Sequence, residues 1–199
     1  MLHIEDSKHM RILADNCIEF IDAAAIGDTA KVRQMLDKGM DPDTQGPKGW
    51  TGLRMAAVND CHEVAYELLM RGAAVDAVNF TGQTALMMGC AYGRSQMATL
   101  LLFHCADPNR ANLGGRTPLM IAASYGYVHV LGVLLDTCPR IDLDRTARNG
   151  KSALQMARED GHDEVVRMLL AAGATEQTKD LGANRMSADW QRVLTGRAI

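Results

Sequence analysis

The chain has 199 residues, of which 47% are hydrophobic and 23% are charged, with a formal net charge of −3. This composition excludes a mainly disordered chain, because such chains are poor in apolar residues and carry a high net charge. No run approaches the roughly 18 apolar residues of a membrane span, and charged residues interrupt Met1–Leu13, where a secretory signal would be apolar. The slight acidity argues against broad nucleic-acid binding, which leaves a basic footprint.

Cysteine usage indicates the compartment. The chain has five cysteines, an odd number, and none of them belongs to a Cys-x-x-Cys pair. This pattern is neither a disulfide framework nor a zinc motif. The sequence therefore predicts a protein of a reducing compartment, the cytoplasm first and the nucleus second. The five residues are Cys17, Cys61, Cys90, Cys105 and Cys138.

The strongest signal is an internal repeat. The pattern Gly-x-Thr/Ser-x-Leu recurs at intervals of 33, 33 and 35 residues, starting at Gly49, Gly82, Gly115 and Gly150. In each copy, a hydroxyl residue two places after the glycine is a good helix N-cap, because its oxygen accepts an unpaired backbone N–H. These residues are Thr51, Thr84, Thr117 and Ser152. Eleven residues after the opening glycine stands a helix stop, which is Asp60, Gly93, Gly126 or Gly161.

A second helix follows in every copy. It carries paired apolar residues four apart, as in Val64/Ala65 and Leu68/Leu69, and this spacing predicts one buried stripe. The frame continues upstream, where Ala23-Ala24 and Met35-Leu36 fall 33 residues before Ala56-Ala57 and Leu68-Leu69. We therefore expect about five units, of which the first is atypical because its outer face meets water.

These residues resemble the ankyrin-repeat family over roughly residues 17–176, most of the chain. The resemblance rests on Gly-x-Thr-x-Leu, the Ala-Ala pair, the central glycine and the Leu-Leu pair. It implies an all-α solenoid of stacked helix–turn–helix units, with short β-hairpin-like loops at right angles to the helices. The expected repeats are 17–48, 49–81, 82–114, 115–149 and 150–176, between a helical cap over 1–16 and a tail over 177–199 that has room for a short helix.

The sequence departs from the family pattern at several places. The histidine that often follows the helix start is replaced in all four copies, by Arg54, Met87, Met120 and Gln155. Cys105 and Cys138 stand where a glycine ends the second helix in the other units, and a left-handed cysteine costs about 1–2 kcal/mol there. The fourth unit has two extra residues within Pro139–Asp142, which predict a longer loop. The resemblance also implies that the Asn109 side chain is a candidate for hydroxylation.

Two fragments resemble catalytic motifs but lack a residue that each motif needs, and the repeat pattern explains both of them. Gly150-Lys151-Ser152 resembles the end of a phosphate-binding loop, but Arg145 stands where that motif needs a glycine. His62-Glu63 opens like a zinc-protease helix, but Tyr66 takes the place of the second histidine. The alternative to a non-catalytic protein is an enzyme or metal-dependent protein with a loop-built site near His104 and Cys105, where two adjacent donors are weak evidence. We expect no enzyme activity, cofactor or metal.

A solenoid without a catalytic site carries its function at exposed positions that packing does not fix. In this frame they are the two residues before the opening glycine, the one after it, and the two before the central glycine. By the resemblance, such hairpin tips and the concave helix face bind other proteins. From this set we predict a partner-binding strip of Trp50, Phe80, Gln83, Tyr92, Leu113, Arg116 and Tyr125.

The composition of this strip favours binding, because Trp, Tyr and Arg dominate interaction hot spots. The alternative is that its aromatic side chains lean onto adjacent repeats. We expect an adaptor, scaffold or inhibitory subunit that is a monomer and binds a protein partner, with no nucleic acid and no membrane involved.

Overall fold

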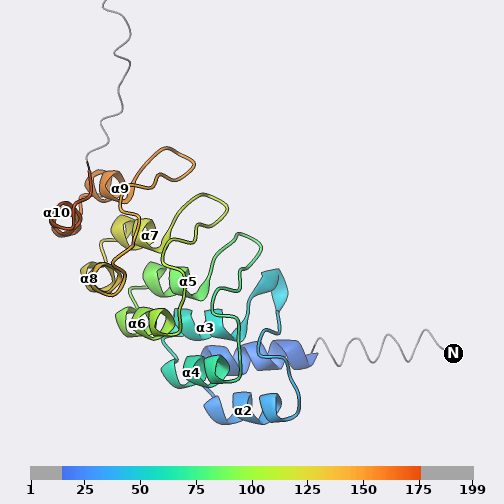
Figure 1. Ribbon diagram of the computed structural model, residues 1–199. Helices are drawn as coiled ribbons and strands as arrows, with labels where there is room; N and C mark the ends of the chain where they lie inside the picture. Colours follow the sequence, from blue (N-terminus) through green and yellow to red (C-terminus); the bar gives the residue numbers. More distant parts are fainter. Residues whose placement is uncertain (1–14, 176–199) are drawn as a thin grey trace, which may run out of the picture.

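The computed structural model describes residues 15–175 (Figure 1). The helical cap expected over 1–16 lies almost entirely outside the described residues, and the tail over 177–199 lies wholly outside them. Residues 15–26 form a helix that pairs with α2 (Thr29–Asp37). A 3-10 turn, η1 (Pro47–Gly49), leads to four further pairs: α3 (Gly52–Asn59) and α4 (His62–Met70), α5 (Ala85–Ala91) and α6 (Ser95–Phe103), α7 (Pro118–Ser124) and α8 (Val128–Thr137), and α9 (Ala153–Glu159) and α10 (Asp163–Ala171).

The helices form two stacked rows. The inner helices α3, α5, α7 and α9 contact one another in series, and the outer helices α2, α4, α6, α8 and α10 do the same. Figure 1 shows the connecting loops projecting from the ends of the inner helices, away from the outer row. The described residues contain no β-strand, only isolated bridges between Gln45 and Thr51 and between Thr146 and Ser152. The predicted all-α solenoid with hairpin-like loops is confirmed.

The predicted helix starts are also confirmed. The side chains of Thr51, Thr84, Thr117 and Ser152 each accept a hydrogen bond from the backbone N–H three residues later. All four are buried, so each cap satisfies a donor that water does not reach. Ser152 forms a full capping box, because the Gln155 side chain in turn accepts from the Ser152 backbone N–H.

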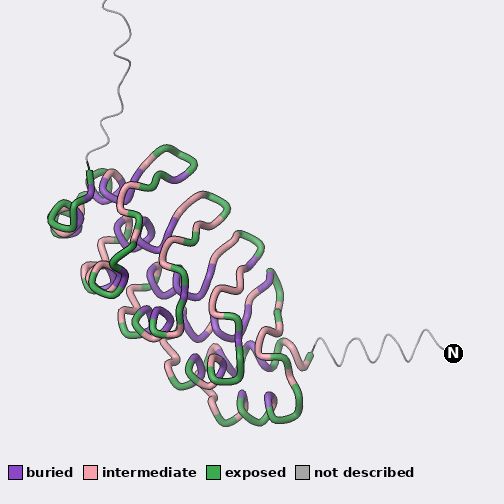
Figure 2. Tube along the Cα trace, viewed as in Figure 1, coloured by how far each residue is buried: buried purple, intermediate pink, exposed green. Residues whose placement is uncertain are grey.

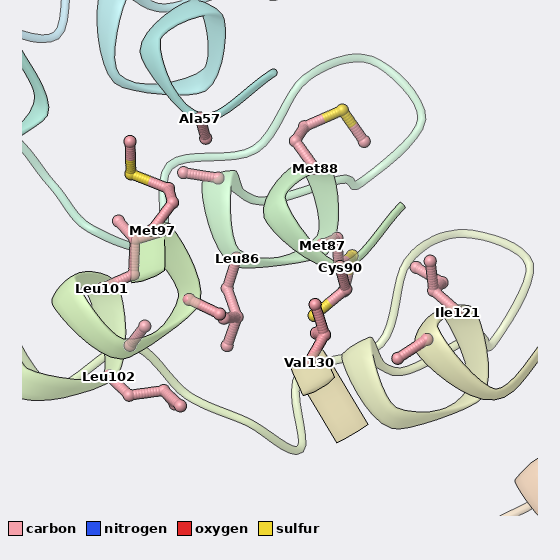
Figure 3. Packing of buried hydrophobic residues seen from close by; sticks show 14 of the residues in the cluster. Ala57, Leu86, Met87, Met88, Cys90, Met97, Leu101, Leu102, Ile121 and Val130 are labelled. Atoms are coloured by element: carbon pink, nitrogen blue, oxygen red, sulfur yellow. The ribbon is translucent and has the colours of Figure 1, made fainter. Parts of the chain in front are cut away.

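One continuous apolar core runs along the array between the two rows. Figure 3 shows side chains of its central part, which come from α5 (Leu86 and Met87), α6 (Met97 and Leu101) and α8 (Val130). Figure 2 shows burial concentrated along the inner helices, while the loop ends are exposed. Met88 and Met156 are buried, and Met35, Met55 and Met168 pack against the core. The methionines therefore fill gaps between repeats, as flexible side chains do.

Each inner helix ends on a left-handed residue, and the next side chain reaches back to the preceding repeat. The φ angle is positive at Asp60, Gly93, Gly126 and Gly161. After Asp60, the Cys61 thiol lies 3.7 Å from the Ala25 carbonyl. The equivalent Arg94 Nε donates to the Val58 carbonyl at 3.3 Å, and His162 Nε2 lies 3.0 Å from the Ser124 carbonyl. Side chains of three different types thus satisfy the same open helix end.

The hairpins bond to one another through their backbones. The N–H of Leu113 donates to the Thr81 carbonyl at 3.0 Å, and the N–H of Arg148 donates to the Gly114 carbonyl at the same distance. A Cβ atom on Gly82 would lie 2.9 Å from the Leu113 nitrogen, and one on Gly115 would lie 2.9 Å from the Arg148 nitrogen. The opening glycine of the repeat is therefore the residue that lets adjacent hairpins touch.

Below the hairpins, connector side chains bond to the next connector. The carboxylates of Asp43, Asp76 and Asp144 each accept the backbone N–H of the residue 31 places later. Asn109 occupies this position before the lengthened fourth loop and uses both ends of its amide. Its Oδ1 accepts the N–H of Asp142 at 2.8 Å, and its Nδ2 donates to the carbonyl of Arg140 at 3.0 Å. The two extra residues thus bring a carbonyl as well as an N–H within reach.

Asn109→Asp is expected to lower the free energy of unfolding by about 1 kcal/mol, because a carboxylate oxygen replaces a donor opposite the Arg140 carbonyl. Asp76→Asn is the matched control and is expected to cost less, because its partner needs only an acceptor. Urea denaturation measures both. Equal losses would show that the second hydrogen bond of Asn109 does not stabilise the array.

The two cysteines at the end of the outer helices differ in conformation. Cys105 has a φ of 64° and is exposed, whereas Cys138 has a φ of −119° and is buried. The left-handed conformation expected of a glycine substitute therefore occurs at Cys105, and the insertion after Cys138 removes it there.

Cys105→Gly is expected to raise the free energy of unfolding by about 1 kcal/mol, because glycine adopts the left-handed conformation without steric cost. Cys138→Gly, the control, is expected to destabilise the array, since it removes a buried side chain and gains no relief of strain. The denaturation midpoints of the two variants decide the matter, and stabilisation by both or by neither would contradict this interpretation.

Candidate functional site

The predicted strip consists of residues on the hairpins and residues at the ends of the inner helices. An ion pair in the last repeat shows this geometry directly. Lys151, the residue after the opening glycine, bonds through Nζ to Glu159 Oε2 at the end of α9. In the last repeat, the hairpin position after the glycine therefore faces the last turn of the inner helix. Trp50, Gln83 and Arg116 hold the same position in the earlier repeats.

Four large side chains of the strip are exposed. Phe80 and Leu113 stand at equivalent hairpin tips with 72% and 57% of their surface accessible. Tyr92 and Tyr125 stand at the ends of two successive inner helices, α5 and α7, with 50% and 54% accessible. Figure 2 shows the exposed hairpin ends that carry the first pair. Repeats two to four thus present large apolar groups to solvent, which is a mark of interaction sites.

These side chains are held by the framework. The ring of Tyr125 stacks on that of Tyr127 with centroids 5.9 Å apart. Tyr127 in turn lies over Gly93, where a Cβ atom would come within 3.0 Å of the ring. Tyr127 is not among the predicted site residues, although its place directly after a central glycine is shared by the inter-repeat residues Arg94 and His162.

Trp50 differs from the other aromatic residues of the strip. It is half-buried and packs against the core, and its ring lies 5.9 Å from the guanidinium carbon of Arg54. Arg54 is fully buried and donates from Nη1 to the Ala77 carbonyl at 3.1 Å, while its Nε and Nη2 have no hydrogen-bond partner. Burial lowers the pKa of Arg54 to about 10. Trp50 therefore covers a buried cation that lacks two hydrogen-bond partners, in addition to its predicted place in the strip.

Gln83 is tied into its own hairpin. Its Oε1 accepts from Asn79 Nδ2 at 3.1 Å and from Thr81 Oγ1 at 3.0 Å. The Asn79 side chain also accepts the backbone N–H groups of Thr81 and Gln83. Gln83 thus fixes the shape of the loop that carries Phe80.

Arg116 is half-buried, and its Nε has no hydrogen-bond partner. Its backbone N–H donates to the Asn112 side chain, which holds the hairpin in the same way as Asn79 does. Within residues 15–175, no carboxylate forms an ion pair with Arg116. Of the predicted strip residues, Arg116 is therefore a cation whose Nε has no hydrogen-bond partner.

The alternative site at His104 and Cys105 lies on the outer row. The His104 ring packs edge-on against Tyr66 and Phe103, at centroid distances of 6.2 and 5.7 Å. Among the described residues, no group of three or more His, Cys, Asp or Glu side chains is arranged to hold a metal ion. In the same part of the chain, no helix has the length and apolar character of a membrane span.

The outer row carries exposed apolar residues that sequence reasoning missed. Phe103 is 81% accessible, Met70 61% and Tyr66 52%. They lie on α4 and α6, whose opposite faces are buried in the core. The unbroken apolar run Leu100–Phe103 at the end of α6 is the available signal, because it is longer than one buried stripe needs.

Arg54→Met is expected to raise the free energy of unfolding by about 1–3 kcal/mol, because an apolar side chain replaces a buried charge. The gain is expected to be equal at pH 6 and pH 9, both below the Arg54 pKa of about 10. It shrinks only at higher pH, where the folded state releases this proton before the unfolded chain does. Urea denaturation at both pH values tests this, and a loss of stability would mean that the contacts with Ala77 and Trp50 outweigh desolvation.

The sequence comparisons agree with this architecture. A family model described as ankyrin repeats, three copies, matches residues 20–112 and 104–180, so the two matches together span most of the chain. A comparison with curated proteins returns no match. The chain belongs to the ankyrin-repeat family.

Proposed function

We propose that this protein binds another protein through the strip of Trp50, Phe80, Gln83, Tyr92, Leu113, Arg116 and Tyr125, without catalysis of its own, as an adaptor, scaffold or inhibitory subunit. Ankyrin repeats are in general protein-interaction modules. The observation that carries the proposal is the exposure of four large side chains on adjacent repeats, two at hairpin tips and two at helix ends. Such side chains bury large areas on binding with little loss of conformational entropy.

The fixed positions of these side chains support the same proposal. Tyr125 is stacked on Tyr127, and the Phe80 ring lies against Gly49 of the preceding hairpin. Groups that are already ordered lose less entropy when a partner binds, so more of the contact energy appears as affinity.

We further place this function in the cytoplasm or nucleus, with the protein acting as a single chain. The support for the compartment is that all five cysteines are free thiols, as is usual where the cell keeps thiols reduced.

The experiment compares partners captured by three forms of the full chain: wild type, Tyr92→Ala/Tyr125→Ala, and the control Phe103→Ala on the outer row. We expect the double variant to lose the partner of wild type, with affinity reduced at least about tenfold, as for hot-spot tyrosines. We expect the control to keep it.

Denaturation of the same proteins separates binding from folding. The double variant is expected to stay within about 1 kcal/mol of wild type, because both rings are half exposed. A partner that is lost only with Phe103→Ala would move the binding surface to the outer row and refute the proposal.

A further inference from the structure

The repeats provide an internal comparison for one position of the strip. In the last repeat, the residue after the opening glycine contacts the residue eight places later, at the end of the inner helix. This pair is Lys151 and Glu159, and it forms an ion pair. In the fourth repeat the same positions hold Arg116 and Ser124. The cation is retained, but the carboxylate that faces it in the next repeat is missing.

The nearby groups do not replace that carboxylate. The Ser124 hydroxyl donates to Asp160 Oδ2 of the last repeat at 2.9 Å. This hydrogen bond occupies both the Ser124 hydroxyl and that carboxylate oxygen. The Nε of Arg116 is buried and has no hydrogen-bond partner. An arginine carries five N–H donors that match a carboxylate with two parallel bonds. A buried donor without a partner costs free energy, which a bound carboxylate would recover.

Exposed apolar side chains stand on the two elements that Arg116 joins, its hairpin and α7. Leu113 lies at the tip of the same hairpin, and Tyr125 follows Ser124 at the end of α7. A carboxylate held between these side chains is partly shielded from water, which strengthens its attraction to the guanidinium. The carboxylates of Glu159 and Asp160 lie in the last repeat, C-terminal to Arg116. They repel the acidic group of a partner and so limit where it can bind.

We propose that the strip binds a peptide segment of the partner in which an Asp or Glu stands next to apolar side chains, with its carboxylate on Arg116 and the apolar groups on Tyr92, Leu113 and Tyr125. The carboxylate takes the place that Glu159 holds beside Lys151. The proposal rests on the proposed function and adds the chemistry of the partner to it.

The test uses the full chain as bait for a library of random 12-residue peptides displayed on phage, with the Tyr92→Ala/Tyr125→Ala chain as the counter-selection. We expect the enriched peptides to share an acidic residue flanked by apolar ones. Selection on Arg116→Glu is expected to replace the acidic residue by Lys or Arg, because the sign of the charge at this position is reversed.

A synthetic peptide of the enriched sequence then measures the contact. Arg116→Met and replacement of the acidic residue by its amide are each expected to weaken binding at least about tenfold, and the two changes together little more than one alone. Arg148→Met is the matched control, because this cation stands at the next hairpin tip, and it is expected to leave the affinity unchanged. Added salt is expected to weaken wild type more than Arg116→Met.

The outcomes separate this inference from the proposed function. If no peptide depends on Tyr92 and Tyr125, the proposed function fails as well. If peptides depend on them but lack an acidic residue, or bind Arg116→Met equally well, only the inference about Arg116 is wrong. The chain's own Asp189-Trp190 has the same chemistry. Peptides that bind only to a Trp190→Ala chain would therefore mean that this segment fills the strip, and would overturn the assignment to a partner.

Discussion

Neighbouring repeats satisfy polar groups that each would leave open alone, and the rest of the structure depends on this exchange. The carbonyl of Ser124 at the end of α7 is bonded by His162 from the next repeat, and the N–H of Asp107 is bonded by Asp76 from the repeat before. A single helix pair would leave these groups and one apolar face to water. The array therefore holds together through its junctions, as expected when each unit contacts only its neighbours.

The same exchange explains why the side chains of the proposed strip stay exposed. Junction residues such as Gly82 and Arg94 are fixed by contacts on both sides, so they carry no information about a partner. Phe80 and Tyr92 are their neighbours in the sequence, but Phe80 exposes 72% of its surface and Tyr92 exposes 50%. The framework positions these side chains without covering them, and it does so for Tyr125 through the stacked ring of Tyr127.

The features that the sequence predicted well are local ones. A hydroxyl cap such as Thr84 depends on a backbone N–H three residues away, and the left-handed Asp60 depends only on its place at a helix end. The features that escaped prediction depend on distant residues. Trp50 is half-buried because Arg54 lies beneath it, and Cys138 loses the left-handed conformation because the loop after it is longer. The repeat aligns Arg116 with Lys151 and Ser124 with Glu159, but only the fold shows that Lys151 and Glu159 form an ion pair.

The double hydrogen bond of Asn109 has a consequence for anyone who rebuilds this array. An amide in the third repeat bonds to the lengthened loop of the fourth, so these two features form one structural unit that crosses a repeat boundary. Trimming that loop to the common length, or transplanting the fourth repeat behind a different neighbour, separates them. Such chimaeras would need an aspartate or an asparagine chosen to match the loop, although the two positions lie more than thirty residues apart in the chain.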